Sequence, residues 1–412
     1  MRSFLCLALA VLAGCASPPP IASSSDLPVV VLVSIDGFRA DYLDRSDVEA
    51  PTLRQLAAEG TRAERMVPVY PTKTFPNHYS LVTGLNPAQH GIVGNTMFDP
   101  SILDDEGQPI RFSLGNRDAV TDARWWGGEP IWVTAERQGL RTGTVFWPGS
   151  EAAIGGVRPS HWLVFDGGMP YAARVDTALA WLDVPERPRL LTLYFQHVDD
   201  MGHRHGPDAP DVDAAIEEVD DALARFLNGL RQRGLDADLV ITSDHGMTAV
   251  STERRIVLDE RMDLDAEAES VIWGEAAGIY PAEGVDADAL VTRLDAHPHM
   301  SAYARDATPA RFRYRDNPRI PPVVLIPDEG WTVTSQGYVD RYPERPSGGA
   351  HGYDNQLESM QAFFLASGPS IRAGETIPEL SALDVYGLLA QLLDVTPAPN
   401  EGDPSVAERV LR

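Results

Sequence analysis

The sequence predicts a doubly wound α/β fold, in which a mostly parallel sheet carries helices on both faces. Short runs of apolar and β-branched residues, typical of strands buried on both faces, recur at residues 28–35, 143–146, 190–195, 239–242 and 362–365. Helical patterns lie between these runs. Strands that alternate with helices favour a parallel sheet of this kind.

The clearest helical pattern lies between the third and the fourth of these runs. Apolar side chains recur there at spacings of three and four, and Gly234 follows a last turn that contains Arg231 and Arg233. The apolar residues are Val212, Ile216, Val219, Leu223, Phe226 and Leu230. Residues 296–350 are instead rich in Pro, Arg and Asp, and we expect a small irregular insertion there. Residues 27–412 are interpreted as a single domain.

Residues 1–26 are interpreted as a signal peptide followed by a flexible tether. Arg2 precedes an apolar run over residues 4–12, which is too short to span a membrane as a helix. The run ends in Leu-Ala-Gly-Cys at Cys15, which resembles the lipobox of bacterial lipoproteins and implies a lipid anchor on this thiol. Ala16 resembles the pattern that directs such proteins to the outer membrane, facing the periplasm. The alternative is a plain signal peptide that is cut near Ala16.

The charge of the chain restricts its partners. The formal net charge is −26 for 412 residues, which argues against binding of nucleic-acid polymers, because these need a basic surface. An anionic small molecule would need local positive charge, most simply from bound metal. Nothing in the composition specifies an oligomeric state.

Candidate metal ligands follow the predicted strands at their carboxyl ends, where functional groups collect in α/β sheets. They are Asp36, then Asp199 and His203, then Asp244 and His245, and finally His351 in a glycine-rich turn. Each alone is more often a helix cap or a turn residue. Together they form two sets of carboxylates and imidazoles, which suit two divalent ions, most simply zinc.

Residues 71–78 add a candidate nucleophile. Pro76 suits the first turn of a helix, so Thr74 is expected just before a helix N-terminus, where anionic oxygen is favoured. A threonine hydroxyl is a poor nucleophile unless a metal ion lowers its pKa. Without metal, Thr74 is better interpreted as an ordinary N-cap.

Residues 71–84, Pro-Thr-Lys-Thr-Phe-Pro-Asn-His-Tyr-Ser-Leu-Val-Thr-Gly, resemble the nucleophile segment of bacterial nucleotide pyrophosphatases/phosphodiesterases. The resemblance continues in order through residues 89–92, 95–100, 146–150, 202–207, 243–247 and 350–353. It implies the fold of the alkaline phosphatase superfamily and the activity of a type I phosphodiesterase or nucleotide diphosphatase.

The resemblance also implies roles for the candidate residues. One zinc ion would be held by Asp199, His203 and His351, and the other by Asp36, Asp244, His245 and the oxygen of Thr74. Asn95, with a backbone N–H of the nucleophile segment, would donate to a phosphoryl oxygen. Thr74 would form a covalent ester that water hydrolyses. From the residues alone, Asp200 competes with Asp199 and Thr72 with Thr74, and the alignment favours Asp199 and Thr74.

Aromatic side chains suggest the transferred group. By resemblance, Phe75 and Phe165 would stack on the two faces of a base, with Leu114 in the same slot, which predicts release of nucleoside 5′-monophosphates with weak base preference. Because such a slot also accepts apolar groups, a phospholipid or choline-type phosphodiesterase is one alternative. A phosphomonoesterase and a non-catalytic, lipid-anchored binding protein are two others.

Overall fold

The computed structural model describes residues 28–104 and 106–412. The predicted signal peptide, with Cys15, lies outside the described residues.

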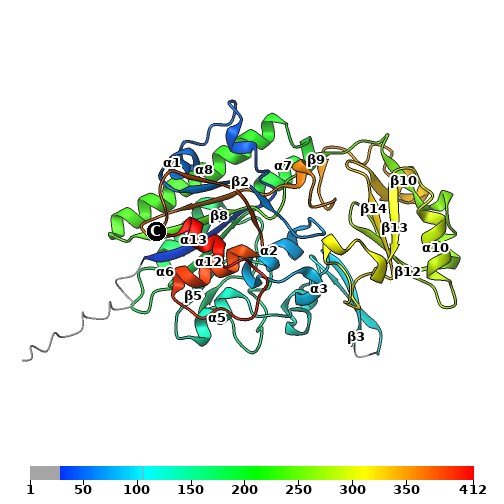
Figure 1. Cartoon of the computed structure of the whole chain (residues 1–412), viewed down its shortest axis with the longest axis horizontal. Coiled ribbons are helices and arrows are strands. Elements are labelled where there is room, and N and C mark those ends of the chain that lie inside the picture. Colours follow the sequence, from blue (N-terminus) through cyan, green and yellow to red (C-terminus); the bar gives the residue numbers. More distant parts are fainter. Residues whose placement is uncertain (1–27, 105) are drawn as a thin grey trace, which may run out of the picture.

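An eight-stranded mixed sheet forms the centre of the molecule, with helices on both faces (Figure 1). The strand order is β18–β2–β17–β8–β1–β7–β5–β6, and only β17 runs antiparallel to its neighbours. The strands are β1 (Val29–Ile35), β2 (Thr61–Val67), β5 (Thr142–Val145), β6 (His161–Trp162), β7 (Leu190–Phe195), β8 (Ala237–Thr242), β17 (Phe364–Ser367) and β18 (Glu375–Ser381). The doubly wound α/β prediction is confirmed.

β1 lies in the middle of this sheet, and every one of its residues is buried. Because successive side chains of a strand point to opposite faces, β1 contributes to two separate cores. Val30 and Leu32 join one of them, and Val31 and Val33 join the other. This explains why the predicted strand is apolar throughout rather than alternating.

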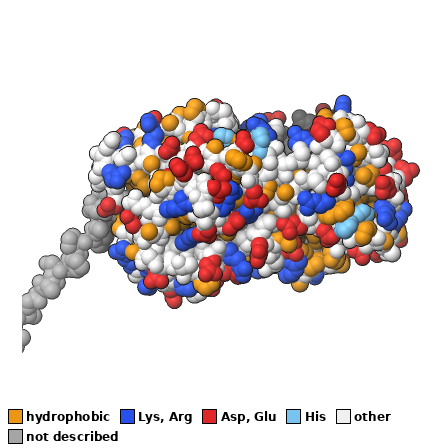
Figure 2. Space-filling view, turned by 90° about the horizontal axis from the view of Figure 1, so that it is seen from above, with side chains coloured by type: hydrophobic (Ala, Val, Ile, Leu, Met, Phe, Trp, Pro, Cys, Tyr) orange, Lys and Arg blue, Asp and Glu red, His pale blue; other side chains and the backbone are white. Residues whose placement is uncertain are grey.

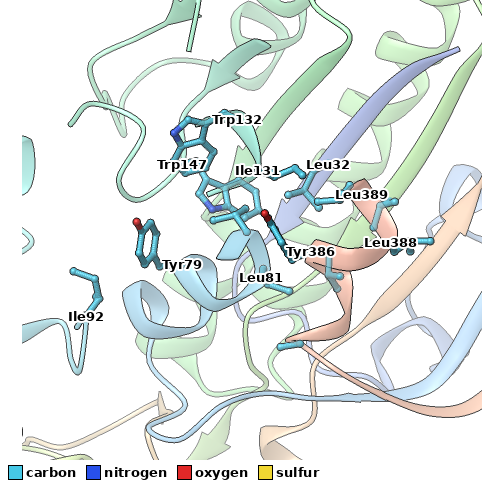
Figure 3. Packing of buried hydrophobic residues seen from close by; sticks show 14 of the residues in the cluster. Leu32, Tyr79, Leu81, Ile92, Ile131, Trp132, Trp147, Tyr386, Leu388 and Leu389 are labelled. Carbon is cyan, nitrogen blue, oxygen red and sulfur yellow. The ribbon is translucent and has the colours of Figure 1, made fainter. Parts of the chain in front are cut away.

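The first face is covered by α2 (Thr74–Thr83), α3 (Pro87–His90), α5 (Ile131–Arg137), α12 (Asp384–Leu393) and α13 (Ser405–Val410). Figure 3 shows Leu32 of β1 near Leu389 of α12, with Leu81 of α2 in the same cluster. The core therefore fixes α2, whose first residue is Thr74, against the central sheet.

The second face is covered by α1 (Pro51–Glu59), α6 (Tyr171–Trp181) and α8 (Pro210–Arg233), and α7 (His197–His205) packs beside α8. α8 contains all six apolar residues of the predicted helix, and all six are buried. It ends at Gly234, whose left-handed conformation, with φ of 61°, is common after the last turn of a helix.

The expected insertion is present, but it begins before residue 296 and is more regular than the sequence suggested. A four-stranded antiparallel sheet, in the order β11–β12–β14–β13, lies beside the central sheet with its own apolar core (Figure 1). It contains α9 (Leu264–Glu267), β11 (Ala268–Ile272), β12 (Ala277–Pro281), α10 (Ala287–Leu294), β13 (Met300–Ala304) and β14 (Val323–Pro327). The sequence does not show this sheet clearly because β11 is only partly buried.

Shorter elements join the two sheets. A parallel pair is formed by β10 (Arg255–Val257) and β15 (Thr332–Thr334), and α11 (Gln336–Arg341) follows it. The antiparallel pair of β9 (Thr248–Ala249) and β16 (Gly349–Ala350) leads directly to His351. A hairpin of β3 (Thr96–Leu103) and β4 (Pro109–Ser113), followed by α4 (Arg117–Thr121), completes the described chain. Among the helices of residues 28–104 and 106–412, none is long and apolar enough to cross a membrane.

Candidate active site

The six candidate metal ligands converge at the carboxyl ends of the central strands, although they lie far apart in the sequence. Asp36 follows β1, and Asp244 and His245 follow β8. Asp199 and His203 lie in α7, which begins two residues after β7 ends. His351 follows β16. The ends of these neighbouring strands bring the ligands together, as the sequence predicts.

One group of donors comprises Asp36, Asp244 and His245, all of them buried. His245 Nε2 lies 2.9 Å from Asp244 Oδ2 and 3.6 Å from Asp36 Oδ1. The other nitrogen, Nδ1, donates to the carbonyl of Gly246 at 2.9 Å. Although burial lowers it, the Asp244 carboxylate raises the pKa of His245 above its ordinary value, so a proton on Nε2 can pair with the carboxylates. In the neutral ring Nε2 instead carries a lone pair directed at two carboxylate oxygens, where a metal cation can take the place of that proton.

A second group comprises Asp199, His203 and His351. The Nε2 atoms of the two rings lie 3.1 Å apart, and the Asp199 carboxylate lies 3.4 Å from His203 Nε2 and 3.7 Å from His351 Nε2. The rings of His245 and His351 stack with centroids 3.5 Å apart, so the two groups are adjacent. Adjacent sites of this kind suit two-metal chemistry on a phosphoryl group.

In each carboxylate of the first group, one oxygen accepts a hydrogen bond and the other accepts none, although Asp244 Oδ2 lies 2.9 Å from His245 Nε2 and 3.2 Å from His78 Nδ1. Tyr194 donates to Asp36 Oδ2 at 2.5 Å, and the backbone N–H of Gly37 donates to Asp244 Oδ1 at 3.2 Å. The buried atoms without a hydrogen-bond partner include Asp36 Oδ1, Asp199 Oδ1, Asp244 Oδ2 and His245 Nε2. Buried polar atoms are normally paired. These four buried atoms have no hydrogen-bond partner and come from two adjacent groups, so they fit as ligands of divalent cations. Carboxylate oxygens and imidazole nitrogens suit zinc.

The electrostatics of the site agree with this fit. Burial, together with the carboxylates of Asp244 and Asp199, raises the pKa of Asp36 well above its ordinary value. Burial, with His245 nearby, lowers the pKa of His351 well below its ordinary value, so this ring stays neutral and can act as a ligand. Crowded buried carboxylates are unfavourable by themselves, and a divalent cation offsets that cost.

Thr74 and Thr72 have different surroundings. Thr72 is fully buried, and its Oγ1 lies 3.0 Å from the carbonyl of Tyr353 and accepts a hydrogen bond from Gly352 N–H. Thr74 instead lines the pocket that also contains Asp36 and Asp199. The helix α2 begins at Thr74, with Lys73 as its N-cap, so Thr74 occupies the first helical position rather than the expected cap.

Asn95 is placed beside the start of α2. Its Oδ1 accepts a hydrogen bond from the backbone N–H of Phe75 at 2.9 Å. This contact directs the Nδ2 group of Asn95 away from that N–H, and Nδ2 has no hydrogen bond within the described residues. The Nδ2 group of Asn95 is therefore available as a donor near the start of α2.

The proposed base-binding residues line one pocket of 250 Å³ together with Thr74. Phe75 packs against Phe112 and Trp126, and Phe165 packs against Phe146. Leu114 and Phe165 are each 45% exposed, so their apolar surface is available to a ligand. Because both phenyl rings are supported from behind, the slot is largely formed before any ligand enters.

Asp200, the alternative to Asp199, is exposed, whereas Asp199 Oδ1 is buried among the histidines. The histidines without a predicted role have ordinary surroundings. His90 is buried between Ser80 and Ile92 N–H, and His161 stacks on Trp181. His297 and His299 contact Trp331 in the insertion.

Comparison with known proteins places this geometry in a family. The sequence profile described as "Type I phosphodiesterase / nucleotide pyrophosphatase" matches residues 30–354. The chain belongs to this family. It is 36% identical to rat ectonucleotide pyrophosphatase/phosphodiesterase family member 1 over 395 residues, which are 93% of this chain and 42% of the relative. It is 37% identical to the venom phosphodiesterase of Macrovipera lebetinus, covering 93% of this chain and 45% of the relative.

The chain thus spans less than half the length of these curated relatives. Among solved structures, it is similar to an inactive threonine-to-alanine variant of murine ectonucleotide pyrophosphatase/phosphodiesterase 5 in complex with AMP. The TM-score is 0.85 at 34% identity, and the alignment covers 93% of this chain and all of the other.

In this member of the phosphodiesterase family, further residues that strand-end reasoning does not find contact the site, and one of them is the buried His78, whose Nδ1 lies 3.2 Å from Asp244 Oδ2. Tyr194 donates to Asp36, as described above. Lys73 forms an ion pair with Glu275 of the insertion at 2.9 Å and donates to the carbonyl of His351. Of Tyr194, Lys73 and Glu275, only Lys73 has a sequence signal, because it directly precedes the candidate nucleophile Thr74, whereas Glu275 lies 202 residues away along the chain.

Proposed function

We propose that the chain is a two-zinc nucleotide pyrophosphatase/phosphodiesterase that releases nucleoside 5′-monophosphates through a covalent ester on Thr74. The observation that carries this proposal is one pocket that contains Thr74, the donors Asp36 and Asp199, and the aromatic slot. The nucleophile, the place for the phosphoryl group and the place for the base are thus adjacent.

The residues of the chain have distinct parts in the proposed reaction. Thr74 Oγ loses its proton and bonds to phosphorus, while the bond from phosphorus to the leaving oxygen breaks and its electron pair stays on that oxygen. Water then attacks the same phosphorus, and the Thr74 oxygen leaves and regains a proton. Asn95 Nδ2 donates to a non-bridging oxygen. Two divalent cations, held by the six ligands, would lower the pKa of the hydroxyl and offset the phosphate charge.

The overall acidity of the chain is compatible with an anionic substrate. In Figure 2, Asp and Glu side chains are scattered over the visible face among Lys and Arg. Positive charge at the bound cations would therefore dominate locally, where the phosphate binds. The AMP complex of the murine relative, a threonine-to-alanine variant, is the comparison that supports both the nucleotide and the threonine.

Three chromogenic substrates test the proposal. The wild type should hydrolyse p-nitrophenyl thymidine 5′-monophosphate faster than p-nitrophenyl phosphate or p-nitrophenyl phosphorylcholine. If the monoester is preferred, the chain is a phosphomonoesterase. A preference for p-nitrophenyl phosphorylcholine would identify a lipid-type phosphodiesterase. If zinc-loaded protein hydrolyses none of the three substrates, the alternative of a non-catalytic binding protein is favoured instead.

We also propose that the protein is an exported bacterial lipoprotein anchored through Cys15 and facing the periplasm. The support is the sequence of residues 4–16 alone. Expression of the full chain in a bacterium with radiolabelled palmitate should label the wild type, which should then fractionate with the outer membrane. Cys15→Ala should remain unlabelled, and equal labelling of both chains would overturn the proposal.

A further inference from the structure

His78 is a buried histidine that has no part in the reaction described above. It lies in α2, four residues after Thr74, and its side chain is fully buried. It belongs to residues 71–84, but neither its place in the predicted fold nor the resemblance gives it a role. A buried imidazole needs a polar partner for each of its ring nitrogens.

The Nδ1 atom of His78 lies between the candidate nucleophile and a candidate metal ligand. It is 2.8 Å from the carbonyl oxygen of Thr74 and 3.2 Å from Asp244 Oδ2. A carbonyl oxygen can only accept a hydrogen bond, so Nδ1 carries a hydrogen and donates to Thr74. Asp244 Oδ2 lies beside this N–H without accepting a hydrogen bond from it, and therefore stays available to a cation.

The Nε2 atom fixes the ring from the other side. It lies 2.7 Å from the Oγ atom of Ser34, a buried residue of β1. Because Nδ1 carries the hydrogen, Nε2 of the neutral ring accepts a hydrogen bond from the Ser34 hydroxyl. The ring therefore joins the start of α2 to β1, the strand that Asp36 directly follows.

Aromatic side chains hold the ring of His78 in this orientation. Trp147 and Tyr194 pack edge-on against it, with ring centroids 5.1 and 5.2 Å away, respectively. The indole N–H of Trp147 also donates to the backbone carbonyl of His78 at 3.0 Å. Tyr194 in turn donates to the candidate ligand Asp36. A side chain that is locked by packing and by hydrogen bonds can hold the groups it contacts in a fixed geometry.

His90 shows how a buried histidine with a purely structural role differs. Its ring lies 3.0 Å from Ser80 Oγ and accepts a hydrogen bond from the N–H of Ile92, and neither partner is a candidate site residue. The ring of His78 instead contacts the backbone of Thr74 and faces the carboxylate of Asp244. A shift of this ring would therefore move the hydroxyl of Thr74 relative to a metal ligand.

We propose that His78 is a positioning residue, whose Nδ1–H holds the backbone of Thr74 beside Asp244 and thereby sets the distance from the threonine hydroxyl to a cation bound by the first group of donors. The inference rests on the proposed function and adds a residue to it. Side chains that orient metal ligands contribute about 10- to 100-fold to metal affinity or activity. Small displacements of a nucleophile are costly as well.

Two substitutions of His78 distinguish between its two nitrogens. The amide nitrogen of Asn can take the place of Nδ1, whereas that of Gln takes the place of Nε2. His78→Gln should therefore lose the hydrogen bond to Thr74 and lower kcat for p-nitrophenyl thymidine 5′-monophosphate by about 10- to 100-fold, with KM nearly unchanged. His78→Asn should retain more of kcat than His78→Gln. The reverse order would overturn the proposal.

Zinc binding supplies a readout that does not depend on turnover. Metal-free protein is titrated with zinc in a calorimeter. In His78→Gln, one of the two sites should bind zinc about 10- to 100-fold more weakly, because Asp244 is held less firmly, and the other site should be unchanged. Equal weakening of both sites, or wild-type affinity at both, would overturn the proposal.

Ser34→Ala is a milder variant in case substitutions of His78 disrupt folding. It leaves the Nδ1–H of His78 in place but releases the ring at Nε2. It should therefore weaken the same zinc site and lower kcat by a smaller factor than His78→Gln. Wild-type values of both in Ser34→Ala, together with unfolded His78 variants, would count against a positioning role and for a structural one.

His90→Gln is the matched control, since it is the same substitution at another buried histidine that contacts α2. It should leave kcat and both zinc affinities unchanged. If His90→Gln reproduces the losses of His78→Gln, they reflect general damage to the fold and the positioning role fails. If the wild type hydrolyses p-nitrophenyl thymidine 5′-monophosphate but the His78 variants match it, only the positioning role fails. If the wild type does not hydrolyse that substrate, the proposed function fails, and the zinc titration alone decides whether His78 supports Asp244.

Discussion

The Nε2 atoms of His203 and His351 lie 3.1 Å apart, although the Nδ1 atom of each ring already contacts a backbone carbonyl oxygen. A neutral imidazole carries one N–H, and the carbonyls of Gly349 and Thr72 fix it on Nδ1. Two lone pairs then face each other across a distance at which they repel. A shared cation converts this repulsion into attraction, and the arrangement therefore predicts metal dependence.

Chelation should remove two metal ions per chain and abolish phosphodiesterase activity, and added zinc should restore both. His351→Ala should lower the metal content measured by inductively coupled plasma mass spectrometry, because this ring belongs to a buried group of donors. His205→Ala is the matched control, since His205 lies on the same helix as His203 but its ring faces Asp211, at 3.8 Å, rather than a candidate metal ligand. Full activity of chelated, metal-free protein would contradict the prediction.

Substitutions of Thr72 and Thr74 should have sharply different effects on kcat. Thr74→Ala should lower kcat by about 10³-fold or more, as removal of a nucleophile does in other hydrolases, with metal content unchanged. Thr74→Ser should retain part of the activity because it keeps a hydroxyl. Thr72→Ser, which preserves the contacts with Tyr353 and Gly352, should behave like the wild type. Activity that depends on the Thr72 hydroxyl instead would reassign the nucleophile.

Phe165→Ala should weaken nucleotide binding. Loss of one stacking partner costs about 1–3 kcal/mol, which corresponds to a rise in KM of about 5- to 150-fold. Phe165→Tyr should restore the KM for p-nitrophenyl thymidine 5′-monophosphate. Val164→Ala, next to Phe165 but outside the pocket, is the control, because Val164 is 59% exposed. An unchanged KM in Phe165→Ala would show that this ring is only structural.

Lys73 should act as a positioning residue for Thr74. Its ammonium group joins Glu275 of the insertion to the carbonyl of the ligand His351, and it directly precedes the nucleophile. Lys73→Met and Glu275→Gln should each lower kcat by about tenfold, because small displacements of a nucleophile are costly. A double-mutant cycle should show less than the sum of the two effects, since both changes break one ion pair. Additive losses would mean that the two residues act independently.

His90 should make the stability of the protein sensitive to acid. Burial lowers the pKa of His90 to about 3, whereas an unfolded chain has the ordinary value near 6.5. The unfolded state therefore binds a proton first as the pH falls, and stability declines between pH 6.5 and 3 by at most about 1.4 kcal/mol per unit. In urea titrations, the advantage of the wild type over His90→Gln should shrink from pH 7 to pH 4. Parallel curves for the two proteins would contradict this assignment.

The sequence predicts best those parts of the molecule whose pattern is local. β1 and β7 are apolar throughout because helices cover both faces of the sheet, and α8 repeats its apolar residues at helical spacing. The strand β2, which lies between β17 and the edge strand β18, was not predicted. It alternates between buried and exposed side chains and contains Arg62, Glu64 and Arg65, so it lacks an apolar run.

The same distinction applies to the site. The convergence of the six candidate metal ligands could be predicted because strand ends and dipeptides such as Asp244-His245 are visible in the sequence. Their grouping was implied by resemblance, and the distances agree with it. The contacts of Tyr194 and of Glu275 could not be predicted, because each depends on how distant segments pack.

The spread of the ligands from Asp36 to His351 has a consequence for the whole fold. Both cysteines of the chain, Cys6 and Cys15, lie before the first strand, so the folded domain has no thiol with which to form a covalent cross-link. Each bound cation would fasten the ends of separate strands to one another in the folded state and would be released on unfolding, so its binding free energy would add to the stability of the fold. The melting temperature should accordingly rise with the free zinc concentration, which makes the metal supply of the compartment a determinant of how long the protein persists there.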